Sequence, residues 1–189
     1  MRKKILFLAG MMACCSLAGA QEISKTWVAD KGNGTYQNPV LHADYSDPDV
    51  CAAGDDFYMT ASSFNCIPGI PILHSNDLVN WSLVNCALPI QEPEEFFDKA
   101  QHGKGVWAPA IRFHNGEFYI YWGDPDYGIY MIKAKDPKGR WSKPVLVKAG
   151  KGMIDATPLW DEDGKVYLIH AYAGSRSGVN SILVICELN

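Results

Sequence analysis

The chain has 189 residues, which is room for one domain of moderate size. Its formal net charge is −4, and this acidic balance argues against nucleic acid or an anionic membrane surface as a partner. A neutral ligand such as a sugar is compatible with it.

The first residues predict an export signal. Residues 2–4 are basic, residues 5–17 form an apolar run, and residues 18–20 (Ala-Gly-Ala) offer the small side chains that a signal peptidase recognises. We therefore expect a signal peptide over residues 1–20 and a periplasmic or extracellular protein. The apolar run is too short for a membrane span, so none is predicted.

Two other interpretations of this segment stay open. A lipoprotein would be acylated at Cys14 or Cys15, although the preceding Met-Met-Ala fits such a site poorly. A buried N-terminal helix is the other. Removal of residues 1–20 would leave 14 basic and 21 acidic residues, a net charge of −7, which strengthens the exclusion of nucleic acid.

The rest of the chain is a repeating β pattern. Residues 21–35 are polar and are interpreted as a leader or linker. From residue 36, short β patterns alternate with turn residues, and a single short helix is expected within 92–99. The strands repeat in three units, each with a glycine turn before an aromatic strand. The segments are 47–50, 54–60, 71–78 and 80–84; 108–111, 115–122, 128–134 and 139–142; and 156–160, 163–169 and 181–186.

Radial repetition of such units builds a β-propeller. Three units leave sheet surfaces uncovered and strand edges unpaired. We therefore expect residues 36–189 to be the front part of a longer propeller. A compact β-sandwich is the alternative.

Asp47 is the first candidate for chemistry. It stands with Asp44 and Asp49 in a run otherwise rich in apolar and turn residues. Pro48 fixes its own φ and has no N–H, so the turn is stiff and holds the carboxylate as a general base must be held. Asp49 lies on the same side if the segment is extended. An ordinary Asp-Pro turn is the alternative.

Asp155 occupies the matching place in the third unit, just before the strand start at 156–160. The innermost strands of successive propeller blades face one axis, so Asp47 and Asp155 are expected to share a cavity and to shift each other's pKa. A carboxylate that caps the strand start is the alternative.

Trp107 is interpreted as the second unit's counterpart of these acids, facing the cavity and suited to the apolar face of a sugar. Phe64 is a candidate wall of the same cavity. A core tryptophan is the alternative for Trp107. Asp124 and Asp126 follow a strand and could bind sugar hydroxyls, but a solvated turn is favoured.

The remaining reactive side chains show no site pattern. The spacings of Cys51, Cys66, Cys86 and Cys186 match no zinc motif. Export permits disulfides, yet free buried thiols fit equally well, and no pairing is predicted. The histidines show no metal-ligand spacing, and no nucleophile triad is found.

The motifs together resemble glycoside hydrolase family 43. The resemblance covers about residues 36–189. It rests on Asn38–Leu41, Asp47–Val50, Asp55–Tyr58, His74–Trp81, Val106–Pro109 and Ile154–Ala156. Members are five-bladed β-propellers that remove arabinofuranosyl or xylosyl units from plant polysaccharides with inversion. The resemblance thus implies a plant-type oligo- or polysaccharide as partner.

The resemblance also implies roles for individual residues. Asp47 matches the general base, and Asp155 matches the acid that sets the pKa and orientation of the proton donor. Trp107 and Phe64 match positions that line the sugar pocket. No cofactor and no catalytic metal are implied, although some relatives hold an ion such as calcium or sodium at the propeller centre.

One expected residue is missing. The proton donor should be a Glu at a Glu-Gly-Pro-like strand start, and neither Glu117, at a turn, nor Glu187, on an outer strand, matches it. We therefore expect the chain to lack its general acid and about two blades, and to be inactive as it stands. Hydrolysis of an unactivated arabinoside or xyloside by residues 21–189 would contradict this. A non-catalytic sugar-binding propeller and a truncated gene product are the alternatives.

Overall fold

A computed structural model describes residues 26–188. The predicted signal peptide at 1–20, with Cys14 and Cys15, and the first residues of the predicted leader lie outside the described residues. Within 26–188, no helix is long and apolar enough to cross a membrane.

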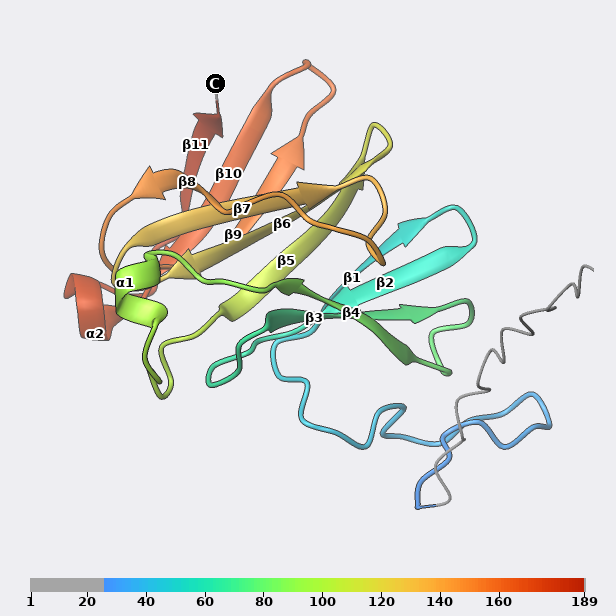
Figure 1. Cartoon of the computed structure of the whole chain (residues 1–189). Coiled ribbons are helices and arrows are strands. Elements are labelled where there is room, and N and C mark those ends of the chain that lie inside the picture. The colour runs from blue at the N-terminus through green and yellow to red at the C-terminus, as the bar shows by residue number, and fades with distance from the viewer. Residues whose placement is uncertain (1–25, 189) are drawn as a thin grey trace, which may run out of the picture.

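The described chain is all-β, with three antiparallel sheets that follow one another in chain order (Figure 1). The first contains β1 (Asp49–Ala53), β2 (Asp56–Thr60), β3 (Gly69–Ser75) and β4 (Ser82–Leu88). The second contains β5 (Trp107–His114), β6 (Glu117–Asp124), β7 (Gly128–Ala134) and β8 (Val145–Ala149). The third contains β9 (Met153–Trp160), β10 (Val166–Tyr172) and β11 (Val184–Leu188). Two short helices are α1 (Glu94–Phe97) and α2 (Gly174–Ser177).

Tight glycine turns explain why each sheet starts with a hairpin. Gly54, Gly116 and Gly164 have φ of 66°, 79° and 82°, in the left-handed region that side chains disfavour. They join β1 to β2, β5 to β6 and β9 to β10. The three repeats read from the sequence are therefore confirmed as three sheets.

The core lies between neighbouring sheets. Along β6, Ile120 and Trp122 point into the cluster shared with the first sheet, whereas Tyr121 points into the cluster shared with the third. This alternation is what a strand buried on both faces requires. The second sheet is consequently the middle layer of the described chain.

Two sequence predictions of local structure meet different outcomes. The short helix expected within 92–99 is confirmed as α1. The prediction of a strand at 139–142 is wrong, because the fourth strand of the second sheet is β8, further along the chain. Trp141 is buried and its indole N–H donates to the Pro137 carbonyl, so it anchors the turn before β8.

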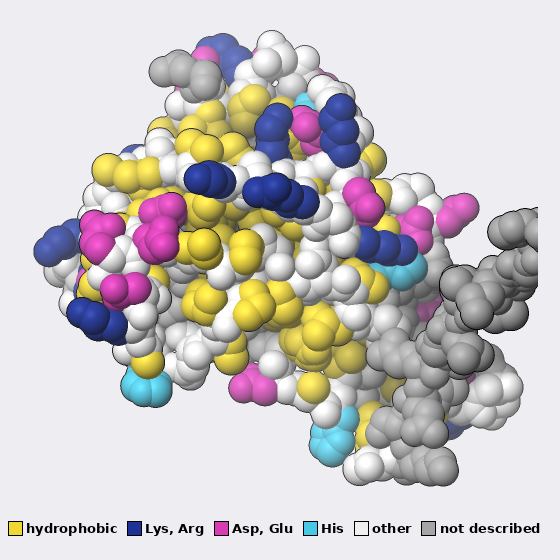
Figure 2. All heavy atoms as spheres, in the orientation of Figure 1, with side chains coloured by type: hydrophobic (Ala, Val, Ile, Leu, Met, Phe, Trp, Pro, Cys, Tyr) yellow, Lys and Arg dark blue, Asp and Glu magenta, His cyan; other side chains and the backbone are white. Residues whose placement is uncertain are grey.

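Apolar side chains remain exposed on the outer sheets. Leu83 on β4 and Ile185 on β11 keep 52% and 67% of their surface, and Figure 2 shows hydrophobic side chains across much of one face. This exposed apolar area is larger than scattered single residues on a protein surface would give. It fits the expectation that further sheets pack here.

Candidate active site

The first strands of the three sheets lie side by side. β5 packs against both β1 and β9. Asp47 directly precedes β1, Trp107 opens β5, and Asp155 is near the start of β9. The topology therefore gathers these three residues at one end of the molecule.

A strained backbone conformation marks the same place in each of these segments. Asp47, Ala108 and Asp155 have φ of 49°, 35° and 55°, which non-glycine residues rarely adopt. In β5 and β9 one extra residue interrupts the pairing at this point, as in a β-bulge. Strain of about 1–3 kcal/mol for each such residue is typical of functional sites.

This geometry corrects two details of the sequence interpretation. Asp155 lies inside β9, at the bulge, and not before the strand. The residue of the second sheet that matches Asp47 and Asp155 is Ala108, and Trp107 precedes it by one position. The bulges could not be read from a pattern that assumes unbroken strands.

Ser62 fixes the Asp47 carboxylate. The Ser62 hydroxyl donates to Asp47 Oδ2 at 2.7 Å and accepts from the Ala108 N–H at 2.8 Å. It thereby ties the entry of β1 to the entry of β5. Within residues 26–188 the bond from Ser62 is the hydrogen bond of the Asp47 carboxylate, which leaves Oδ1 without one, and the residue is exposed. Ser62 is not singled out by the sequence, because a contact between the β1 and β5 entries leaves no local sequence signal.

Asp155 is electrostatically coupled to Asp47. Its side chain is still exposed, yet surrounding protein atoms desolvate it enough to raise its pKa, and the negative charge of Asp47 raises it further. The two acids therefore lie close enough for the charge of Asp47 to act on Asp155, while the expected cavity between them stays a prediction.

Phe64 and Trp107 form an aromatic wall. Their ring centroids are 6.1 Å apart with an interplanar angle of 72°. The Trp107 indole N–H donates to the Gly103 carbonyl at 2.9 Å, and the Gly105 N–H donates to the Phe64 carbonyl at 2.8 Å. A Cβ on Gly105 would lie 2.3 Å from the Ser63 carbonyl, so only glycine permits this approach.

Asp49 does not join the site. Its Oδ2 accepts from the Ile111 N–H at 2.7 Å and from Arg112 Nη1. It connects the first sheet to the second, which is a structural role.

Asp124 is buried, and its interpretation as part of a solvated turn is wrong. It is 2% exposed and its Oδ1 accepts from the N–H groups of Asp126 and Tyr127 at 2.9 and 3.1 Å. Burial raises the pKa of Asp124 to about 6 despite these bonds. Its burial follows from the packing of the loop before β5 over the β6–β7 turn, where Phe96 meets Tyr127. No local sequence signal shows that contact.

Gly123 sets how closely the third sheet approaches the second. A Cβ on Gly123 would lie 2.4 Å from the Met153 carbonyl and 2.7 Å from Ile154 Cα. The backbone just before Asp155 therefore rests directly on the backbone of β6.

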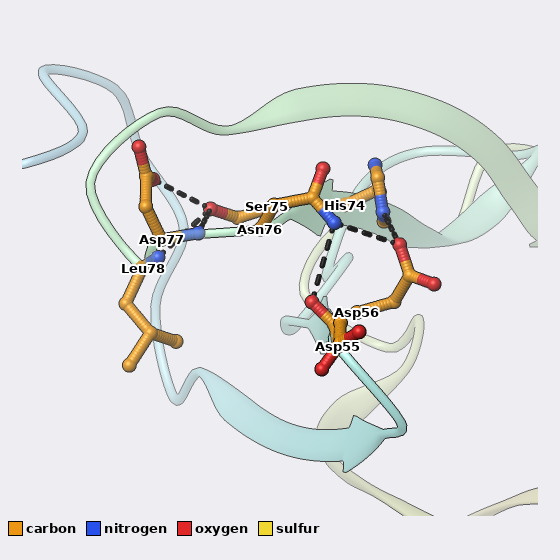
Figure 3. A network of polar contacts seen from close by, with 7 residues as sticks. All are labelled: Asp55, Asp56, His74, Ser75, Asn76, Asp77 and Leu78. Atoms are coloured by element: carbon orange, nitrogen blue, oxygen red, sulfur yellow. Dashed lines mark hydrogen bonds and ion pairs between the residues drawn. The ribbon is translucent and has the colours of Figure 1, made fainter.

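Two segments that carry part of the family resemblance, 55–58 and 74–81, have a structural role. They meet at the end of the first sheet away from Asp47. His74 Nε2 and Asp56 Oδ1 are 2.5 Å apart, and the Asn76 side-chain amide donates to Asp56 Oδ1 at 2.9 Å (Figure 3). The Leu78 N–H donates to Ser75 Oγ at 2.9 Å. This network closes the turn after β3.

The other reactive residues form no second site in the described part of the chain. Cys51, Cys66, Cys86 and Cys186 are free, and no group of three or more potential ligands could hold a metal ion within 26–188. Glu117 and Glu187 pair with lysines at 3.0 and 2.8 Å. Neither is placed as a proton donor to the site.

Comparison with known proteins identifies the family. The model of glycosyl hydrolases family 43 matches residues 36–189. The chain belongs to glycosyl hydrolase family 43. It is 36% identical over 173 residues to a beta-xylosidase of Formosa agariphila and 37% identical over 139 residues to a non-reducing end alpha-L-arabinofuranosidase of Bacteroides ovatus. These alignments cover 87% and 71% of this chain but only 29% and 26% of the relatives.

Solved structures of the family have the same fold over this region. A family 43 protein from a xyloglucan locus of Bacteroides ovatus matches with a TM-score of 0.66 and 30% identity. A xylan beta-1,4-xylosidase of Bacillus halodurans matches with a TM-score of 0.67 and 27% identity. The matches cover 80% and 81% of this chain and 29% and 31% of those chains. The three sheets are thus part of a family 43 propeller.

Proposed function

We propose that the protein to which this chain contributes is an inverting glycosidase that removes arabinofuranosyl or xylosyl units from plant polysaccharides. The observation that carries the proposal is the pair of coupled carboxylates, Asp47 and Asp155, held on strained backbone beside the aromatic pair Phe64 and Trp107. The names of the relatives, a beta-xylosidase and an arabinofuranosidase, support the substrate class.

Asp47 is the general base in this proposal. The Ser62 hydroxyl occupies Oδ2, which leaves Oδ1 to accept a proton from a water molecule that attacks the anomeric carbon. Inverting glycosidases hold the base and the acid about 6.5–9.5 Å apart to admit this water. Trp107 and Phe64 would bind the apolar face of the sugar.

Asp155 would orient the proton donor and adjust its pKa. The donor itself would be a glutamate of a further blade, because Glu117 and Glu187 pair with lysines and the chain covers only 29% and 26% of the length of the two relatives. The 189-residue chain alone should therefore lack activity on unactivated arabinosides and xylosides. Export to the periplasm or the medium, where polysaccharides are met, belongs to the same proposal.

The test is Asp47→Asn in the complete protein. Loss of the general base should lower kcat/KM for an aryl xyloside or arabinofuranoside by about 10²–10⁴-fold, with sugar binding retained. Asp44→Asn, at an exposed aspartate three residues earlier, is the matched control. Unchanged turnover by Asp47→Asn would exclude the assigned base and favour a non-catalytic sugar-binding propeller.

A further inference from the structure

A lysine, a histidine and a cysteine from three different strands meet between the second and third sheets. Lys148 Nζ on β8 lies 3.1 Å from His170 Nε2 on β10, and it donates to Cys186 Sγ on β11 at 3.5 Å. β8 belongs to the second sheet, whereas β10 and β11 belong to the third (Figure 1). The amine nitrogen and the sulfur are therefore in contact across the boundary between two sheets.

His170 holds the Lys148 amine in this place. The histidine is fully buried, and its Nδ1 lies 3.1 Å from the Ala171 carbonyl, which only accepts, so Nδ1 carries the ring proton. Burial, and to a smaller extent the charge of Lys148, lower the pKa of His170, which keeps the ring neutral at neutral pH. Nε2 is therefore an acceptor for one N–H of Lys148. No carboxylate of residues 26–188 forms an ion pair with this lysine.

Cys186 is oriented toward the amine and accessible to a small reagent. Its Sγ lies 3.7 Å from the Leu168 carbonyl, to which the thiol donates, so a sulfur lone pair is left to accept from Lys148. Cys186 is half-buried, and together with Lys148 it lines a cavity of about 680 Å³ between the two sheets. A molecule of the size of water enters a space of this volume.

We propose that hydrogen peroxide cross-links Cys186 to Lys148. The peroxide O–O bond breaks, an S–O bond forms, and the thiol becomes a sulfenic acid while one water leaves. The Lys148 nitrogen then attacks the sulfur and forms an S–N bond. The displaced hydroxide takes up the proton from nitrogen and leaves as a second water, and a lysine that starts as the ammonium releases one further proton to solvent. One peroxide thus converts a thiol and an amine into a sulfenamide.

The contact favours this product over further oxidation. A sulfenic acid either condenses with a neighbouring nucleophile or is oxidised on to the sulfinic acid. A nitrogen held against the sulfur has a high effective concentration, which speeds condensation. The new bond joins residues 38 positions apart and fixes β11 of the third sheet to β8 of the second. A small thiol reverses it, because it attacks the sulfur and releases the amine.

The test is peptide mapping of the complete protein after treatment with hydrogen peroxide. Free thiols are alkylated before digestion with trypsin. We expect trypsin to stop cleaving after Lys148, and a linked peptide pair that contains Lys148 and Cys186 to be about 2 Da lighter than the sum of its two peptides. Dithiothreitol should release both peptides. The linked protein should also have a higher Tm than the reduced protein, because the bond closes a loop in the unfolded chain.

Matched variants separate this reaction from general oxidation. Lys148→Arg keeps the positive charge but should abolish the link, and Cys186→Ser should abolish it as well. If Lys148→Arg does not fold, Lys148→Gln replaces it. Lys165→Arg is the control, because Lys165 pairs with Glu187 and donates to no cysteine within residues 26–188. This variant should form the link as the parent does.

The following results would overturn the inference. Cys186 recovered as the sulfinic acid, with Lys148 unmodified, would show that peroxide reaches the sulfur but the amine does not. An unchanged Cys186 under conditions that oxidise the exposed Cys66 would show that peroxide does not reach the sulfur. A linked pair about 14 Da heavier than its two peptides would show that an oxygen stays between nitrogen and sulfur, which excludes the sulfenamide.

Discussion

Replacement of Asp124 by asparagine should stabilise the protein at neutral and alkaline pH. The carboxylate is buried and becomes charged at the pH of most assays, because its pKa of about 6 lies below that range. Asparagine keeps an oxygen that can accept from the Asp126 and Tyr127 N–H groups, so the turn geometry is retained.

The magnitude follows from linkage. The pKa of Asp124 rises from an ordinary 3.8 to about 6 in the folded protein. Since the folded pKa is raised, the protonated Asp124 carboxyl contributes its full share to the unfolding free energy below pH 3.8. This contribution is lost as the pH rises through 6. A difference of about two pH units corresponds to roughly 3 kcal/mol of unfolding free energy above pH 7. Asp124→Asn should therefore gain about 2 kcal/mol more at pH 8 than at pH 4.

Urea unfolding of parent and variant, followed by tryptophan fluorescence from pH 4 to pH 8, measures this difference. Other titrating groups cancel when the two proteins are compared at each pH. Asp44→Asn, at an exposed aspartate, is the control and should show no such trend. A gap between parent and Asp124→Asn that is constant with pH, or that shrinks as pH rises, would refute the assignment of a raised pKa.

Three further results are expected around the site. Gly105→Ala should cost about 1–3 kcal/mol of stability in urea unfolding, because the new Cβ meets backbone oxygens and pushes Phe64 outward; equal stability would disprove the close approach. Ser62→Ala should lower kcat of the complete protein about tenfold with little change in KM, since the base loses its hydrogen bond; a change confined to KM would argue against positioning. Asp47→Asn should lower the pKa of Asp155 in an NMR titration, because burial and then the charge of Asp47 raise it, and only the second cause is removed; an unmoved pKa would show that burial acts alone.

The strands were largely predictable from local features. Glycine turns before aromatic segments, such as Gly116 before β6, mark each hairpin because the turn needs positive φ and the strand needs alternate faces. The prediction of a strand at 139–142 failed because Trp141 has the burial of a strand residue, while its backbone belongs to the irregular segment between the turn at 137–138 and β8. Burial alone does not distinguish the two.

Candidate residues for the site could be chosen from the sequence, but the geometry that holds them could not be read from it. Asp47, Asp155, Phe64 and Trp107 were found from motif and resemblance. The bulge at Asp155 and the burial of Asp124 depend on how sheets and loops pack against each other. The bridging of Ser62 to Ala108 joins residues 46 positions apart, which no local pattern reveals.

The contact at Gly123 acts as a fixed spacer. Because the Met153 carbonyl and Ile154 Cα rest where a side chain would be, the distance between the second and third sheets is set by main-chain atoms in van der Waals contact. Side-chain rotamers can rearrange with temperature or sequence, but such a contact leaves no freedom to slide inward. Because Gly123 has no Cβ, the third sheet can lie this close to the second, and the close contact helps to fix where Asp155 lies relative to the aromatic wall. A substitution there would widen the mouth of the site before it disturbed any residue inside it.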